Sequence, residues 1–103
     1  MMKFIFKATI KEGHSEQDYI DAWRKGSLPI QASVGAQGTI LYKNLLEPGK
    51  LIAIATWESK DARDLAMRKL KEANAQTDFH RQFGDIELLG YFEEIGRVDP
   101  DKI

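Results

Sequence analysis

A histidine between two phenylalanines is the first place in this sequence where chemistry could occur. His80 lies one residue after Phe79 and three residues before Phe83. An imidazole can take a proton from a phenol or quinol near neutral pH, and oxygen-dependent oxidation of such a compound requires that proton to leave. We therefore expect His80 to be catalytic and Phe79 and Phe83 to contact an aromatic substrate. The alternative is a partly exposed histidine on a short helix.

Three further aromatic side chains could bind an aromatic ligand. Tyr19 and Trp23 lie four residues apart, so they share one face of a helix. They could line a pocket in which the phenol hydroxyl or the indole N–H orients the ligand, although such a pair is more often part of a core. Trp57 ends an apolar segment and could face a pocket or a subunit interface. We take all three as predicted substrate-binding residues, with the core as the alternative.

Several kinds of site are disfavoured by what the sequence lacks. There is no cysteine, which excludes disulfides, thiolate catalysis and Cys-based metal sites. The two histidines, His14 and His80, do not form a short metal-binding motif, and there is no phosphate loop or dinucleotide fingerprint. We therefore expect no metal and no cofactor. Arg24 could hold a carboxylate or phenolate but is better explained as a solvated side chain.

The first half of the chain predicts a strand, a helix and a second strand. Alternating apolar residues predict a strand over residues 3–11. Ser15, with Asp18 three residues later, has the spacing of a capping box, and the helix that follows should stay against the core to about residue 32. Pro29 should weaken or bend this helix because proline lacks an amide donor. The second strand is expected over residues 39–45.

The second half predicts a hairpin, a helix and a last strand. The segment 47–50 is a turn signal because Pro48 suits the second position and Gly49 tolerates a positive φ at the third, so residues 51–58 should return antiparallel to 39–45. Ser59 should cap a helix with a one-sided apolar stripe. The stripe is expected to comprise Ala62, Leu65, Ala66, Lys69, Leu70 and Ala73. Residues 74–84 should form a loop or a short helix capped by Thr77. A last strand should cover 86–98, with Gly90 marking a bulge or a bend, before a frayed tail over 99–103.

This order of elements is that of a ferredoxin-like α+β fold, βαββαβ with a four-stranded antiparallel sheet, in a single domain over residues 1–103. The strand over 51–58 is apolar at consecutive positions, which requires burial on both of its faces. The helices of a short chain can cover one face of the sheet. A second copy of the chain is the simplest cover for the other face, so we expect a homodimer.

The charge pattern gives no sign of a nucleic-acid or membrane partner. The net charge is -1, and lysine and arginine are spread along the chain. Lys3 and Lys7 interrupt the apolar residues near the N-terminus, so we expect no secretory signal there, and no segment approaches the length of a membrane-spanning helix. We expect a cytoplasmic protein, with which the absence of cysteine is compatible.

Four segments together resemble a known family. They are Ala22–Ser27, Gly35–Thr39, Ala53–Ser59 and Phe79–Phe83. In these segments the chain resembles the antibiotic-biosynthesis monooxygenase-like superfamily, over about residues 3 to 97. The resemblance implies that two subunits pair through their sheets into a dimeric α+β barrel, with a pocket between sheet and helices in each. Some members of that superfamily oxidise polycyclic phenols or quinols with oxygen and without a bound metal or flavin.

Other members of the superfamily degrade haem, using an Asn on the first strand, a Trp on the second helix and a His after it. This chain has Ala8 and Ala66 at the first two places. His80 falls near the third place only if a four-residue insertion is allowed. The resemblance therefore does not favour haem degradation.

Three functions remain open on the sequence alone. The first is a cofactor-independent monooxygenase acting on a small polycyclic aromatic or quinol, held between sheet and helices. The second is a non-catalytic dimer that binds a small hydrophobic ligand in the same place. The third is a structural protein whose role depends only on the dimer, against which a roomy apolar cavity would count.

Overall fold

The computed structural model describes residues 1–101 and has the predicted order of strands and helices. A short 3₁₀ helix, η1, precedes the last strand. The elements are β1 (Met2–Ile10), α1 (Glu16–Gln31), β2 (Ala36–Lys43), β3 (Lys50–Trp57), α2 (Lys60–Glu72), η1 (Phe79–Gln82) and β4 (Gly84–Glu93).

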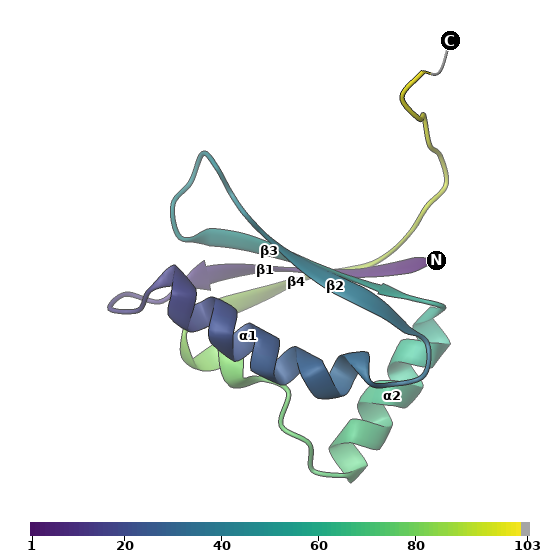
Figure 1. Cartoon of the computed structure of the whole chain (residues 1–103), viewed down its shortest axis with the longest axis horizontal. Helices are drawn as coiled ribbons and strands as arrows, with labels where there is room; N and C mark the ends of the chain where they lie inside the picture. Colours follow the sequence, from purple (N-terminus) through teal and green to yellow (C-terminus); the bar gives the residue numbers. More distant parts are fainter. Residues whose placement is uncertain (102–103) are drawn as a thin grey trace.

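The four strands form one sheet in the order β2-β3-β1-β4, and every neighbouring pair is antiparallel. Both helices lie on the same face of this sheet, and the other face carries no helix (Figure 1). The predicted α+β, ferredoxin-like arrangement with a four-stranded antiparallel sheet is therefore confirmed.

The start of α1 follows directly from two side chains. The Ser15 hydroxyl accepts the Asp18 N–H at 3.0 Å, and the Asp18 carboxylate accepts the Ser15 N–H at 3.1 Å, as predicted for a capping box. Pro29 lies inside α1, yet the helix continues to Gln31. The carbonyl that loses its partner to Pro29 is that of Lys25, an exposed residue, so water can hydrate it.

The predicted hairpin between β2 and β3 is also present, with a longer loop than expected. Gly49 has φ of 80°, and the Lys50 N–H bonds to the Glu47 carbonyl at 3.3 Å. The strand β2 ends at Lys43 and not at residue 45, because the Asn44 side chain accepts the N–H groups of Leu46 and Glu47 and starts the turn early.

The last strand is shorter than predicted. We expected residues 86–98, but β4 is Gly84–Glu93. Glu93 pairs with Met2, the first residue of β1, so the chain beyond it has no strand to pair with. Residues 94–101 have no regular structure, and the last two residues of the predicted tail lie outside the described residues. The expected cap at Thr77 is wrong, since η1 begins after Asp78 and has no side-chain cap.

The core lies between the sheet and the two helices. One buried cluster joins Met2, Trp57 and Ala66, and a second joins Ala8, Tyr19 and Leu51. The first therefore connects the sheet to α2 and the second connects it to α1.

The face without helices, which we call the open face, is partly apolar. Ile5, Ile54 and Ile40 lie opposite one another on β1, β3 and β2, and Ile40 is 56% exposed. The strand β3 is thus apolar on both sides, as its sequence indicated, but the chain covers only one of them. None of the helices in residues 1–101 is both long and apolar enough to cross a membrane.

Candidate functional site

A small cavity, which we call the inner cavity, lies between the sheet and both helices. Its volume is about 70 Å³. Its walls come from β1, β2, β3, α1, α2, η1 and the loop before η1. Its lining includes Phe4, Phe6, Trp23, Trp57, Arg63 and His80.

At one end of the inner cavity, His80 is hydrogen-bonded to a fully buried tyrosine. The Tyr19 hydroxyl and His80 Nδ1 are 2.8 Å apart, and Tyr19 is 0% exposed. The two rings meet edge to face with centroids 5.5 Å apart, and the His80 ring also lies 5.5 Å from that of Phe6. The imidazole is therefore held between the Tyr19 and Phe6 rings.

Two glycines allow this arrangement. The Tyr19 ring lies against the backbone of Gly84, where a Cβ atom would come within 2.7 Å of Tyr19 Cε2. A Cβ atom at Gly26 would collide with the carbonyl oxygen of Thr77, so glycine lets the loop before η1 touch α1. Lys11 then ties η1 to the end of β1, since its Nζ donates to the Arg81 carbonyl at 3.0 Å.

Burial keeps both members of this pair neutral. It lowers the pKa of His80 to about 4, with a further lowering from the Arg81 guanidinium and a smaller opposing effect of Asp78. Burial also raises the pKa of Tyr19 well above its usual value, against an opposing effect of Arg81. At neutral pH His80 is thus an uncharged imidazole and a weaker base than its sequence context suggested.

A cation lies elsewhere in the wall of the inner cavity. The Arg63 guanidinium is 3.8 Å from the Phe4 ring centroid, and its Nη1 donates to the Tyr91 hydroxyl at 3.0 Å. Sequence reasoning missed Arg63 because it placed the apolar stripe of α2 on a face rotated about the helix axis from the face that packs on the sheet. Leu65 of that stripe is 41% exposed, whereas Arg63, Ala66 and Met67 face the sheet or the cavity. The spacing of 63, 66 and 67 is also helical and could have pointed to this face.

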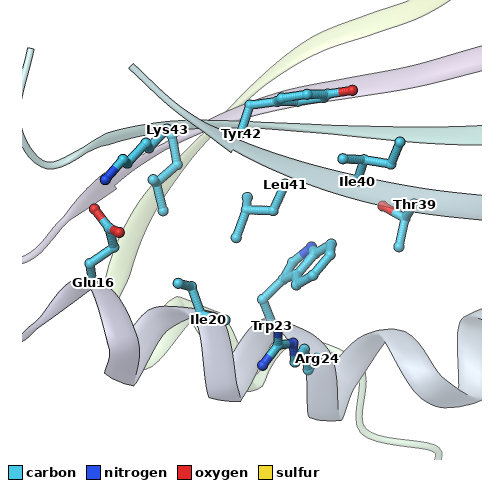
Figure 2. A pocket seen from close by; sticks show the side chains of 10 residues that line it. Glu16, Ile20, Trp23, Arg24, Thr39, Ile40, Leu41, Tyr42 and Lys43 are labelled. Carbon is cyan, nitrogen blue, oxygen red and sulfur yellow. The ribbon is translucent and has the colours of Figure 1, made fainter. Parts of the chain in front are cut away.

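A larger groove lies beside the inner cavity, between α1 and β2. Its volume is about 360 Å³, and we call it the outer groove. Figure 2 shows Trp23 rising from α1 toward β2, with Leu41 and Thr39 across from it. Trp23 and Thr39 line both spaces, so the indole forms part of the wall between them. Arg24 lines only the outer groove and is exposed.

The structure brings some of the predicted site residues together and separates others. His80, Trp23 and Trp57 line the inner cavity, and Tyr19 lies behind His80. Phe79 lies instead under the Lys25 ammonium, 4.4 Å from its ring centroid. Phe83 packs in the cluster of Ala8, Tyr19 and Leu51, with His14 at its edge. Neither phenylalanine lines either space.

No metal site is evident in the part of the chain that the structure describes. Within residues 1–101, no three His, Asp or Glu side chains come together in a way that could hold a metal ion. The inner cavity offers neutral hydrogen-bonding groups, one imidazole and one guanidinium.

Solved structures with the same fold come from several organisms. SnoaB, a cofactor-independent oxygenase from Streptomyces nogalater, is 17% identical, with a TM-score of 0.74, over 96% of this chain and 97% of that one. At3g17210 from Arabidopsis thaliana is 16% identical, with a TM-score of 0.71, over 95% and 99% of the two chains. A Nitrosomonas europaea protein, provisionally described as an antibiotic biosynthesis monooxygenase, is 10% identical, with a TM-score of 0.69, over 93% and 100%.

The chain has the fold of the antibiotic-biosynthesis monooxygenase-like superfamily. No protein-family model and no curated protein matches its sequence. At these identities the structural likeness shows the fold alone.

Proposed function

We propose that the protein is a cofactor-independent oxygenase that acts on an electron-rich aromatic compound of quinol or anthrone type. The observation that carries this proposal is the neutral His80, fixed by Tyr19 in the wall of an apolar cavity between sheet and helices. A neutral imidazole in such a place can bind the oxygen of a substrate while water is excluded from the reacting carbon. The description of SnoaB as a cofactor-independent oxygenase agrees with this class of reaction.

The reaction needs no redox group from the protein. An anthrone-type CH₂ group loses a proton to solvent water before the compound enters the cavity, and the resulting carbanion, which is also an enolate, transfers electrons to O₂ and forms a C–O bond. The peroxide then takes up a proton, and loss of water leaves a carbonyl, so CH₂ and O₂ become C=O and H₂O. The carbon is oxidised, oxygen is reduced, and the protein stabilises the enolate oxygen.

The size of the inner cavity sets a condition on the substrate. An apolar cavity of about 150 Å³ holds benzene, and the inner cavity of about 70 Å³ is smaller. The outer groove of about 360 Å³ is large enough for several rings. We infer that a polycyclic substrate occupies the outer groove and reaches His80 when the Trp23 indole moves aside.

Oxygen uptake tests this function. The wild-type protein should consume O₂ with anthrone or 1,4-naphthohydroquinone, and His80→Leu should lower the rate about 100-fold, as expected for loss of one donor to an oxyanion. His14→Leu is the matched control, because His14 lies outside both cavities, and it should keep the wild-type rate. Circular dichroism would verify the fold of each variant. Unchanged turnover in His80→Leu would exclude His80 from the reaction.

A non-catalytic binder of a small hydrophobic ligand is the second candidate. It is favoured by the lining of the inner cavity, which contains no carboxylate among the described residues and therefore offers no strong general base. Saturable quenching of Trp23 and Trp57 fluorescence by an aromatic ligand, without O₂ uptake or product, would favour this candidate over the oxygenase. Absence of any such binding would leave the structural dimer.

We also propose that two copies of the chain associate through their open faces. The row of Ile5, Ile54 and Ile40 is the main support, because an apolar strand surface left in water favours association. A symmetric pairing would bury the same row on both subunits.

A further inference from the structure

The bond between Tyr19 and His80 determines which nitrogen of the imidazole carries the proton. The Tyr19 hydroxyl is fully buried, and within residues 1–101 its only hydrogen-bond partner is His80 Nδ1. If Nδ1 carried the proton, it would donate to the Tyr19 oxygen, and the tyrosine O–H would have no acceptor and no water. A buried donor without an acceptor is unfavourable enough to favour the other tautomer roughly ten- to hundredfold. Tyr19 therefore donates to Nδ1, and the proton of His80 lies on Nε2.

The Nε2–H group is free to bind a ligand. None of the described residues forms a hydrogen bond with Nε2. Among the described residues that are not exposed, every side-chain nitrogen or oxygen shielded from solvent has a hydrogen-bond partner. Because Nε2 has no such partner, it is not shielded and remains accessible. His80 lines the inner cavity over the Phe6 ring. A neutral imidazole in this tautomer offers one N–H donor and no lone pair to that space. It binds an oxygen and does not accept a proton.

Arg63 adds positive charge to the same cavity without a neighbouring anion. Its guanidinium lies over Phe4, whose ring centroid is 6.2 Å from that of Phe6. No salt bridge joins Arg63 to a carboxylate within residues 1–101, and its one described hydrogen bond goes to the Tyr91 hydroxyl. Its charge therefore remains available to an anionic ligand. The charged groups that act on His80, Arg81 of η1 and Asp78 just before it, are both exposed.

We propose that the inner cavity is an oxyanion-binding site, in which the His80 Nε2–H, fixed in that tautomer by Tyr19, binds the ionised oxygen of a phenol or enol and Arg63 supplies the compensating charge. This oxyanion site rests on the proposed function because it uses the same cavity. It adds that the substrate binds with its oxygen ionised. The site selects aromatic compounds that ionise at oxygen, and it lowers their pKa on binding because a nearby cation favours the charged form.

Nitrogen-15 NMR on the wild-type protein tests the tautomer without any ligand. His80 should show an unprotonated Nδ1 and a protonated Nε2 from pH 5 to pH 8, whereas His14, which is exposed, serves as the internal control. Tyr19→Phe should release the preference and give a mixture of tautomers. A proton on Nδ1 in the wild-type protein, or equal signals from both tautomers, would overturn the proposal.

The ionisation of a bound probe tests the oxyanion site itself. With 4-nitrophenol, whose absorbance separates phenol from phenolate, we expect phenolate to bind at least about tenfold more tightly than phenol, which equals a pKa lowered by one unit or more. His80→Gln keeps an amide N–H donor near the place of Nε2 and should keep most of this preference, whereas His80→Leu and Arg63→Met should each reduce it.

Equal or tighter binding of neutral phenol, or no saturable binding up to millimolar probe, would overturn the proposal. The oxygenase proposal can fail independently. If the tautomer and the phenolate preference are found but no O₂ is consumed, the site is an oxyanion-binding site in a protein without oxygenase activity.

Discussion

The two faces of the sheet are built from the same strands but from different kinds of apolar side chain. On β3 the residues toward the helices are Leu51, Ala53, Ala55 and Trp57, and those toward the open face are Ile52, Ile54 and Thr56. The covered face combines alanines with large aromatic rings, which leaves a small cavity where the helices cannot fill the space. On its open side β3 presents β-branched residues, while the neighbouring strand β1 adds Lys3 and Lys7 on either side of Ile5. The strand β3 thus carries the wall of a cavity on its covered side and part of an isoleucine row on its open side.

The largest expected effect is a difference in the free energy of unfolding between substitutions on the covered face and on the open face. Trp57 is 1% exposed on the covered face, so Trp57→Ala should lower the free energy of unfolding by about 3–5 kcal/mol in urea titrations. The matched change on the open face is Tyr42→Ala, made in the Ile54→Lys background so that association does not contribute. It should change the same quantity by less than about 1 kcal/mol. Equal losses would mean that the two faces do not differ in burial within one subunit.

The second prediction concerns association through the open face. Ile54 lies at the centre of its isoleucine row, and a lysine there would place a charge without a partner in the interface. Ile54→Lys should weaken dimerisation by at least about 100-fold, seen as a change from dimer to monomer mass in sedimentation at micromolar concentration. Val34→Lys, a change at an exposed site between α1 and β2, is the control and should keep the dimer mass. A monomeric wild-type protein would remove the proposed dimer altogether.

The smallest expected effect is a pH dependence of the free energy of unfolding, which arises from His80 on the covered face. The pKa of His80 is about 4 in the folded chain and near 6.5 when unfolded. Between these values the unfolded chain binds more protons, so the free energy of unfolding should fall as pH falls from 6.5 to 4. The loss should be on the order of 1 kcal/mol after allowance for solvent screening of a partly exposed group.

Urea titrations at several pH values would measure this loss. His80→Gln should remove it, while His14→Gln should leave it in place. A wild-type stability curve parallel to that of His80→Gln between pH 6.5 and 4 would contradict the lowered pKa of His80.

The local features of the fold could be read from the sequence because each depends on a few neighbouring residues. The capping box of Ser15 and Asp18, the turn at Pro48 and Gly49 and the bulge at Gly90 are all present. The end of β4 could not be read in this way, since it depends on where β1 begins.

The site was predicted only in part for a related reason. His80 and Tyr19 were both chosen as site residues, but their bond joins residues 61 positions apart and follows from how η1 packs on α1. Arg63 was missed because the rotation of α2 about its axis depends on packing against the sheet, which periodicity fixes only to within a residue or so.

The bulge in β4 shifts the alternation of that strand by one residue. Leu88 pairs with Phe6 and Gly90 with Ile5, so Leu89 is the extra residue, and Gly90 takes a φ of 126°. Beyond the bulge, Tyr91 pairs with Phe4 and Phe92 with Lys3. If Leu89 paired with Ile5 in a regular strand, Tyr91 would pair with Lys3 on the open face, out of reach of Arg63, and Phe92 would pair with Met2 on the covered face. The bulge thus places the Tyr91 side chain beside Arg63 and the Phe92 side chain on the open face.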